Sequence, residues 1–395
     1  MINQHYLSML GNKSVIRELS EYATARGKVI GYENVFDYSL GNPSVPAPEV
    51  YKETAIRLLA ESDPMKLHGY SPSTGHPEAK AKVAAALSRR YGIDYKACHI
   101  FPTAGAAGAI AHAVRAVTTP GDEVIVFAPF FPEYIPYIND TGAQIKIVPA
   151  HFPDFQINFE AFEEMLSEKV AAVLINSPNN PSGVVYTEET LLRLADILRE
   201  RSAAYSHNIF LISDEPYREI VFDGKKVPYT AKFYDHTLTC YSYSKSQSVP
   251  GERIGYIAVN PAAEEADKLD AVFAQISRGI GHNCPTSIVT QVMGEIPDAT
   301  SDLSVYETNM NLLYDALTEL GFTVNRPDGT FYIFPKALED DAVAFCRKAM
   351  KYDLILVPAD GFYAPGYFRI AFCTDTEKVK RSLPVFKKFV EAEYR

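Results

Sequence analysis

The chain has 395 residues, of which 47% are hydrophobic and 22% are charged, so it is long enough to bury a large core and to form two or three domains. A formal net charge of −11 disfavours nonspecific binding to nucleic acid or to anionic membranes, because both need basic patches. The composition therefore favours chemistry on small molecules.

The five cysteines are scattered along the chain without a CxxC pair, which indicates free thiols rather than a disulfide framework or a zinc site. The first twenty residues lack the basic start, apolar run and small-residue cleavage site of a signal peptide. The sequence also lacks an apolar stretch of membrane-spanning length. We therefore expect a cytoplasmic protein without a metal site.

The first part of the chain predicts helices joined by an extended arm. Residues 1 to about 35 are partly helical, with apolar residues at roughly helical spacing between Val15 and Tyr22. The run YSLGNPSVPAP then predicts a proline-marked arm that must lie on another part of the protein. Two helices follow, over residues 48–60 and 78–91.

The middle of the chain alternates between strands and helices. Short apolar, β-branched runs are typical of buried strands, and helical stretches such as residues 106–117 and 188–205 separate them. The predicted strands lie within residues 121–129, 142–150, 170–177, 208–215 and 237–244. This alternation predicts an α/β fold with a mostly parallel sheet covered on both faces. Ligands of such sheets bind beyond the carboxyl ends of the strands.

Beyond residue 260 the alternation stops. A helix over residues 262–274, a glycine-rich break and a helix over residues 304–320 come first, and a compact α+β pattern follows. We expect a smaller α+β domain that the N-terminal arm completes. The predicted division is residues 1–47 for the arm and part of the small domain, 48–290 for the large domain and 291–395 for the small C-terminal domain.

The stretch from Leu238 to Tyr256 concentrates the most unusual chemistry. Lys245 lies between small hydroxyl residues at the end of a β-prone run, and Arg253 follows eight positions later, after a Pro-Gly break. A lysine at the end of a strand is placed to form an imine, and a nearby arginine is placed to hold an anion. The alternative is an exposed loop lysine with an unrelated surface charge.

The helix start in PTAGAAGAIAHAV is a second candidate anion site. Gly105 permits close approach to the backbone N–H groups, and Ala106 and Ala107 present only methyl groups. Ser242 and Arg253 would reach the same edge of the sheet, and such N–H, hydroxyl and guanidinium groups are the usual ligands of phosphate. Without those two residues, the segment would be interpreted as an alanine-rich core helix.

Four further residues follow predicted strands at the ligand edge. Burying the charged carboxylate of Asp214 there costs free energy unless it has a cationic partner, such as a protonated ring nitrogen. A role as a helix cap or in a structural salt bridge would also explain an aspartate at this position. Tyr217 could offer its phenol to a nearby oxygen, and Asn180, in the turn INSPNNPSG, could donate an amide hydrogen bond. Phe131 could stack on a flat ring. Asn180 and Phe131 could also be purely structural, and Tyr217 alone means little in a chain with 25 tyrosines.

Arg369 lies in the strand-like run YFRIAF, among apolar neighbours. An arginine in such a run needs an anionic partner. The sequence leaves two partners open for Arg369, a carboxylate of the protein and a carboxylate of a ligand.

Six segments, in this order, resemble a known family: TAGAAGA, PFFPEY, NSPNNPSG, DEPY, SYSKSQSVPGERIGY and FRIAF. They are similar to motifs of the class I/II aminotransferases, the pyridoxal-phosphate enzymes of the aspartate aminotransferase fold, and the resemblance extends from LGNPSVPAP to Arg369. Each motif alone is weak, but their order and the spacing of Lys245 and Arg253 argue against chance agreement. The resemblance implies fold type I, with a mostly parallel, seven-stranded sheet in the large domain.

The resemblance implies an aminotransferase, which moves an amino group between an amino acid and a 2-oxo acid with pyridoxal 5′-phosphate as cofactor. Lys245 would form an aldimine with the cofactor and shuttle the proton between the substrate Cα and the cofactor C4′. Asp214 would pair with the pyridinium nitrogen, which makes the ring an electron sink. Tyr217 would donate a hydrogen bond to the ring oxygen. The cationic ring and Arg253 would lower the basicity of Lys245.

Other residues would hold the cofactor and the substrate. The implied cofactor contacts, besides Lys245, Asp214 and Tyr217, are Gly105, Ala106, Ala107, Phe131, Asn180, Ser242, Arg253 and Tyr70. Phe131 would stack on the ring, and Asn180 would reach the ring oxygen from the side opposite Tyr217. Tyr70 would reach the phosphate of a neighbouring subunit, so the active site would belong to a homodimer. Gly41 and Arg369, beside Asn180, would receive the substrate α-carboxylate.

One position departs from the family pattern. Some bacterial aspartate aminotransferases carry a lysine, and other relatives a hydroxyl, where this chain has Ala107, so aspartate specificity is not supported there. Arg17 could supply a charge instead, or lie on a solvated helix face. A carbon-sulfur β-lyase is an alternative with the same lysine and phosphate site. A noncatalytic ligand sensor is a second alternative, which the intact Lys245 argues against.

Overall fold

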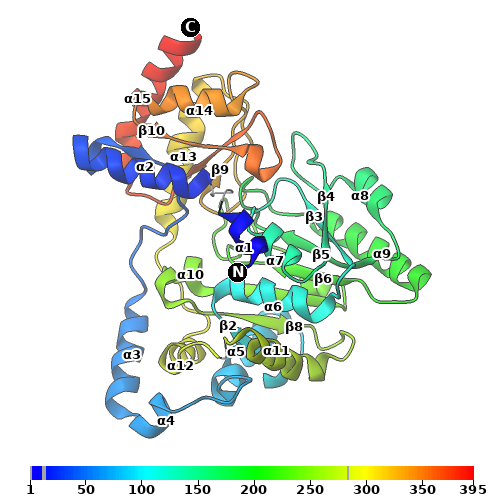
Figure 1. The fold of residues 1–395 in the computed structure, drawn as a ribbon. Coiled ribbons are helices and arrows are strands. Elements are labelled where there is room, and N and C mark those ends of the chain that lie inside the picture. Colours follow the sequence, from blue (N-terminus) through cyan, green and yellow to red (C-terminus); the bar gives the residue numbers. More distant parts are fainter. Residues whose placement is uncertain (1, 11–14, 283) are drawn as a thin grey trace.

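The computed structural model describes residues 2–10, 15–282 and 284–395, and its largest element is a seven-stranded sheet of order β2-β8-β7-β6-β5-β3-β4. The strands are β2 (Ile100–Thr103), β3 (Glu123–Phe127), β4 (Gln144–Val148), β5 (Val170–Asn176), β6 (Phe210–Asp214), β7 (Thr237–Ser242) and β8 (Gly255–Val259). From β4 across to β7 all neighbours are parallel, whereas β8 runs antiparallel to β7 and β2. The prediction of a mostly parallel sheet is confirmed (Figure 1).

Helices cover both faces of this sheet. Val124 and Val126 pack with α6 (Gly105–Val117) and α11 (Ala266–Ile280), whereas Ile125, between them, packs with α9 (Glu188–Tyr205) on the other face. The other helices around the sheet are α3 (Glu49–Glu61), α4 (Pro64–His68), α5 (Pro77–Tyr91), α7 (Tyr134–Asn139), α8 (Phe159–Met165), α10 (Tyr243–Ser246) and α12 (Ser287–Glu295). Because both faces are covered, the strands are nearly continuous apolar runs.

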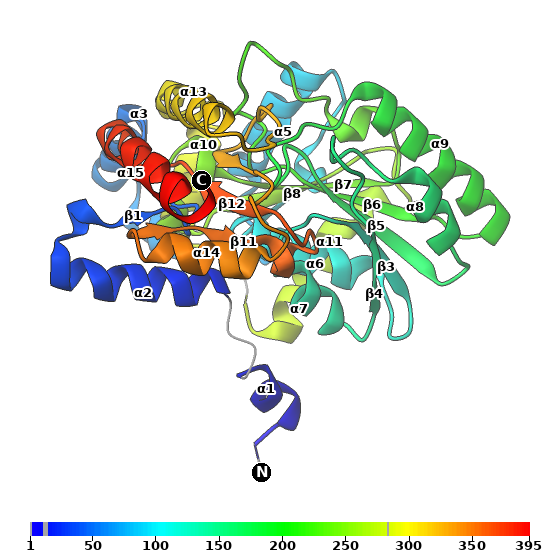
Figure 2. The same cartoon turned by 90° about the horizontal axis from the view of Figure 1, so that it is seen from above.

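The C-terminal part of the chain forms a smaller α+β unit together with the N-terminal arm. Its antiparallel sheet has the order β11 (Val357–Pro358), β12 (Phe368–Ala371) and β9 (Tyr332–Ile333), and its helices are α13 (Ser304–Glu319), α14 (Ala342–Met350) and α15 (Thr376–Tyr394). After the short α1 (Gln4–Met9), α2 (Val15–Ile30) lies beside α14 in both views (Figures 1 and 2). The arm adds β1 (Phe36–Asp37), which pairs in parallel with β10 (Leu354–Ile355).

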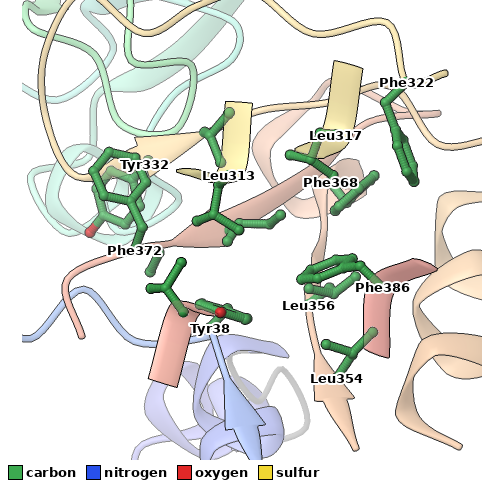
Figure 3. Close-up of a cluster of buried hydrophobic side chains, with 14 of the residues drawn as sticks. Tyr38, Leu313, Leu317, Phe322, Tyr332, Leu354, Leu356, Phe368, Phe372 and Phe386 are labelled. Carbon is green, nitrogen blue, oxygen red and sulfur yellow. The ribbon is translucent and has the colours of Figure 1, made fainter. Parts of the chain in front are cut away.

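An aromatic core holds the arm in this unit. Tyr38 is fully buried in it with Phe368 and Phe386 (Figure 3), and its hydroxyl lies 2.6 Å from that of Ser382 in α15. Tyr217, from the segment that follows β6, belongs to the same core. That segment therefore links the smaller unit to the carboxyl edge of the large sheet.

The predicted helices agree with the structure except for one, which begins and ends later than predicted. The helix predicted over residues 262–274 is α11, which begins at Ala266 and continues to Ile280. The Asn260 side chain explains the delay, because its Oδ1 accepts the N–H of Ala262 in a turn, and Glu265 then adopts a left-handed φ of 54°. Among the described residues, no helix has both the length and the apolar character needed to cross a membrane.

Candidate active site

A cavity of ≈ 470 Å³ lies at the carboxyl ends of the central strands. The segments that follow β3, β5, β6 and β7 line it, together with the start of α6. The smaller unit closes the other side with Tyr332 and Arg369, and the N-terminal α2 and arm contribute Arg17 and Gly41. The cavity therefore lies where doubly wound sheets bind their ligands.

The structure brings nearly all of the predicted site residues together. Those that line the cavity are Gly41, Ala106, Ala107, Phe131, Asn180, Asp214, Tyr217, Ser242, Lys245, Arg253 and Arg369. Gly105 lies just behind them, against Arg253. Tyr70 follows α4, is fully exposed and does not line the cavity of its own chain.

Lys245 is in α10, directly after β7, and its Nζ donates a hydrogen bond of 2.7 Å to the carbonyl oxygen of Gly41. Burial lowers the pKa of Lys245 to about 8, and the guanidinium groups of Arg369 and Arg253 act in the same direction. The sequence predicted that Arg253 would lower this basicity, whereas the structure makes burial the larger cause. A lysine with this pKa is partly neutral at physiological pH.

Asp214 ends β6, and only one oxygen of its buried carboxylate is hydrogen-bonded to described residues. Its Oδ2 accepts a hydrogen bond of 2.5 Å from the Tyr134 hydroxyl and a longer one, 3.4 Å, from Asn176 Nδ2. In the described part of the chain its Oδ1 has no hydrogen-bond partner. Burial raises the pKa of Asp214 to about 7, and the Tyr134 hydrogen bond opposes this shift. A cation beside Oδ1 would restore the charged carboxylate.

An anion cradle lies at the start of α6. Gly105 begins the helix with a φ of 73°, and a Cβ built there would lie 3.0 Å from Nη2 of Arg253. The Arg253 guanidinium donates only to backbone carbonyls, those of Pro250 and Ala104, and no carboxylate of the described residues pairs with it. Ser242 lines the same side of the cavity. Free N–H groups, a hydroxyl and an unpaired arginine are therefore gathered in one place.

Arg369 is 1% exposed, and it lies between the arm and the segment after β5. Nη1 donates to Asn180 Oδ1 at 3.0 Å, and Nη2 donates to the carbonyl oxygen of Ser39 at 2.6 Å. The guanidinium carbon lies 4.4 Å from the centre of the Tyr332 ring, and Nε has no hydrogen-bond partner among the described residues. No acidic side chain within residues 2–10, 15–282 and 284–395 forms an ion pair with Arg369. Of the two partners that the sequence left open, the protein carboxylate is thereby excluded for this part of the chain.

Sequence reasoning missed three polar residues around the site. Tyr134 and Asn176 contact Asp214, and the Tyr332 hydroxyl lies 3.3 Å from that of Tyr217. Tyr134 follows Phe131 by three residues, which is a local signal, but a chain with 25 tyrosines gives it little weight. Tyr332 comes from the smaller unit, so no local pattern places it here. Arg17, which the sequence left undecided, lines the cavity without an ion pair to a described residue.

These groups have complementary needs. A neutral amine reacts with an aldehyde to form an imine, and a buried carboxylate with a free oxygen pairs with a protonated ring nitrogen. The cradle at α6 binds a phosphate. Pyridoxal phosphate carries all three groups on one ring, so the residues present fit this cofactor. The fold and the cavity therefore define an enzyme of the fold-type-I pyridoxal-phosphate class.

Comparison with known proteins agrees with this class. The family model described as aminotransferase class I and II matches residues 33–385. A solved amino transferase from Eubacterium rectale is 44% identical, covers 100% of both chains and has a TM-score of 0.96. The aspartate aminotransferase of Thermotoga maritima is 30% identical over 94% of this chain and 95% of its own, and a solved structure of it has a TM-score of 0.85. A probable N-acetyl-LL-diaminopimelate aminotransferase of Bacillus subtilis is 29% identical over 97% of this chain and 96% of its own.

The chain belongs to the class I and II aminotransferases. It is a pyridoxal-phosphate-dependent transaminase that acts on amino acids and 2-oxo acids. The relatives are named for different amino acids, so family membership leaves the side chain of the substrate open.

Proposed function

We propose that Lys245 is the covalent anchor of pyridoxal phosphate and the proton carrier of the transamination. Bound pyridoxal phosphate supplies the electron sink for the negative charge that develops on the substrate Cα. The lowered pKa of Lys245 leaves part of its amine neutral near pH 7, and a neutral amine accepts the Cα proton. The observation that carries this proposal is one amine of lowered pKa in the same cavity as Asp214 and Arg369.

Four residues are proposed to orient the cofactor ring. Asp214 offers its free Oδ1 to the ring nitrogen. The Oδ1 of Asn180 accepts from Arg369, which leaves its Nδ2 as a donor for the ring oxygen. The Tyr217 hydroxyl is proposed to reach the same oxygen, and Phe131 to stack on the ring face. All of these side chains line the cavity, as this proposal requires.

Ser242, Arg253 and the N–H groups at the start of α6 are proposed to bind the phosphate. The positive φ of Gly105 turns the backbone at this point, and Ala106 and Ala107 leave the first turn of the helix open to the cavity. The positive end of the helix dipole and the Arg253 charge both favour a dianion there.

Arg369 is proposed to bind the substrate α-carboxylate with help from Gly41. The buried guanidinium has an unused Nε, and a planar fork matches a carboxylate geometrically. A Cβ on residue 41 would lie 1.8 Å from the Tyr332 hydroxyl oxygen, so a glycine lets the arm approach this wall. Carboxylate capture at one end fixes the substrate Cα near Lys245.

We also propose a homodimer in which Tyr70 of one copy reaches the phosphate site of the other. Ile56, Leu59, Met65 and Tyr70 expose large apolar side chains on α3, α4 and the segment that follows, which supports contact with a second copy. Mixed dimers of Lys245→Ala and Tyr70→Phe subunits test this arrangement. Such a dimer contains one native site only if Tyr70 acts across the interface, and its activity should then exceed that of either parent.

The chain is proposed to divide into an arm (1–47), a large domain and a small domain, with the small domain closing over substrate. Residue 290, proposed as the end of the large domain, lies inside α12, which packs on α3 and α5. We therefore move this boundary to the segment between Ile296 and Leu303. We further propose a cytoplasmic location, where the five thiols, which are all free, stay reduced.

The half-reaction tests the proposed function. Holoenzyme is mixed with a panel of amino acids without an oxo acid, and the visible spectrum and the released oxo acid are recorded. Transamination predicts a spectral change with one oxo acid per active site, after which the reaction stops. A β-lyase would instead release pyruvate and ammonia from cystathionine over many turnovers, and that result would overturn the proposal.

A further inference from the structure

Only one of the two carboxylate oxygens of Asp214 accepts hydrogen bonds from described residues. The 2.5 Å hydrogen bond from the Tyr134 hydroxyl and the 3.4 Å contact from Asn176 Nδ2 both fall on Oδ2. The main hydrogen bond of Asn176 Nδ2 is not to this carboxylate but to the backbone oxygen of Asp214, at 2.8 Å. The Tyr134 hydroxyl is therefore the group that fixes the rotation of this carboxylate, and Oδ1 is left without a partner among the described residues.

Tyr134 is held rigidly in its place. It opens α7, is 1% exposed, and stacks on Phe130 with the ring centres 6.1 Å apart. Its ring also meets Phe131 edge to face, at 5.9 Å and 86°. One buried side chain thus contacts both Asp214 and Phe131, which are proposed to bind the edge and the face of the cofactor ring.

We propose that Tyr134 is a positioning residue for pyridoxal phosphate: its hydroxyl orients Asp214 so that Oδ1 meets the ring nitrogen, and its ring holds Phe131 against the ring face. This inference rests on the proposed role of Asp214. It adds a residue that does not line the cavity and acts only through its two neighbours.

The charges around Asp214 make this hydrogen bond important. Glu215, which follows directly, raises the pKa of Asp214 in addition to burial, whereas the ammonium of Lys245 lowers it. The thiol of Cys240 and the phenols of Tyr217 and Tyr137 are further titratable groups near this carboxylate, and burial raises the pKa of all three, which keeps them protonated. The Tyr134 hydrogen bond opposes the effect of burial more than the other groups do. Without it, Asp214 would be more easily protonated and free to rotate, and both changes weaken its pairing with a ring nitrogen.

The Tyr134→Phe variant tests the hydroxyl, because it removes one oxygen and keeps both ring contacts. The loss of a hydrogen bond to a charged group should weaken pyridoxal-phosphate binding by on the order of tenfold. Cofactor labelled with nitrogen-15 in the ring gives a second readout, since its chemical shift should move from that of a protonated ring toward that of a neutral one. Neither measurement depends on turnover.

Tyr95→Phe is the matched control, because it removes a buried hydroxyl whose one hydrogen bond within the described residues is to Tyr229, at 2.8 Å. It should leave both readouts unchanged. In an Asp214→Ala background, Tyr134→Phe should have no further effect on cofactor affinity, since the residue acts through Asp214.

Each other outcome overturns a defined statement. If Asp214→Ala leaves the affinity unchanged, the proposed role of Asp214 fails. If Asp214→Ala weakens cofactor binding, but Tyr134→Phe has the cofactor affinity and the nitrogen-15 chemical shift of the wild type, only the inference about Tyr134 fails. A Tyr134→Phe protein that does not fold, or a full effect in the Asp214→Ala background, would also contradict the inference, because the hydroxyl would then serve the fold rather than the carboxylate.

Discussion

Replacement of Arg369 by lysine separates charge from geometry at the proposed carboxylate site. The guanidinium is buried and is fixed by Asn180 Oδ1 at 3.0 Å and by the Ser39 carbonyl at 2.6 Å, so its orientation is already set before substrate arrives. A lysine keeps the positive charge, but its three donors radiate from one atom and cannot reproduce a planar fork. The variant should therefore bind an α-carboxylate with one good hydrogen bond fewer.

The expected magnitude follows from that count. A hydrogen bond to a charged group contributes about 1.5–3 kcal/mol. The apparent dissociation constant of the amino acid should therefore rise roughly tenfold to a hundredfold. The rate constant at saturating substrate should fall less, because Lys245 and Asp214 are unchanged.

Single-turnover kinetics give both numbers. Holoenzyme is mixed with increasing amino acid, and the rate of the visible spectral change is fitted for the dissociation constant and the limiting rate. The matched substrate is the amine that has the same side chain but lacks the carboxylate, and it should show no penalty from Arg369→Lys. An equal loss for both substrates, or no loss for the amino acid, would refute the assignment of Arg369.

Three further predictions concern the cradle, the arm and the lysine. Gly105→Ala should weaken pyridoxal-phosphate binding at equilibrium, because a φ of 73° strains alanine and its Cβ would press on Arg253 at 3.0 Å; unchanged affinity would contradict the proposed cradle. Gly41→Ala should raise the KM for amino acid, since its Cβ would lie 1.8 Å from the Tyr332 hydroxyl oxygen, and Tyr332→Phe in the same chain should restore part of the loss. For Lys245, the folded pKa of about 8 lies below the unfolded value of 10.5, so folding releases a proton and the stability of the cofactor-free protein should rise with pH between these values. Lys245→Met should therefore be more stable than the wild type below about pH 8, and the difference in melting temperature should shrink toward pH 10; a difference that does not vary with pH would contradict the buried amine.

The architecture and most of the site could be predicted because parallel sheets translate sequence order into position. Asn180, Asp214 and Ser242 each end or follow a strand, so the side chains that come next must meet at one edge. The strands themselves could be located because a strand that is covered on both faces is a nearly continuous apolar run. The helix start at Gly105 was visible because glycine and alanine at a strand end leave the backbone open.

The remainder depends on contacts that no local pattern encodes. Tyr332 comes from the smaller unit, and whether it reaches Tyr217 depends on how that unit packs. The free oxygen of Asp214 could not be foreseen, because it depends on where Tyr134 places its hydroxyl. The sequence also predicts a charge effect as the cause of the lowered pKa of Lys245, whereas burial is the larger effect in the structure.

The central claim is that Lys245 carries the cofactor, and borohydride reduction of the holoenzyme tests it directly. Reduction converts an imine between lysine and pyridoxal phosphate into a stable amine, which peptide mass spectrometry locates. The account predicts one phosphopyridoxyl group per chain, on the peptide that contains Lys245, and none on Lys245→Ala. A modification on another lysine, or an active Lys245→Ala enzyme, would contradict it.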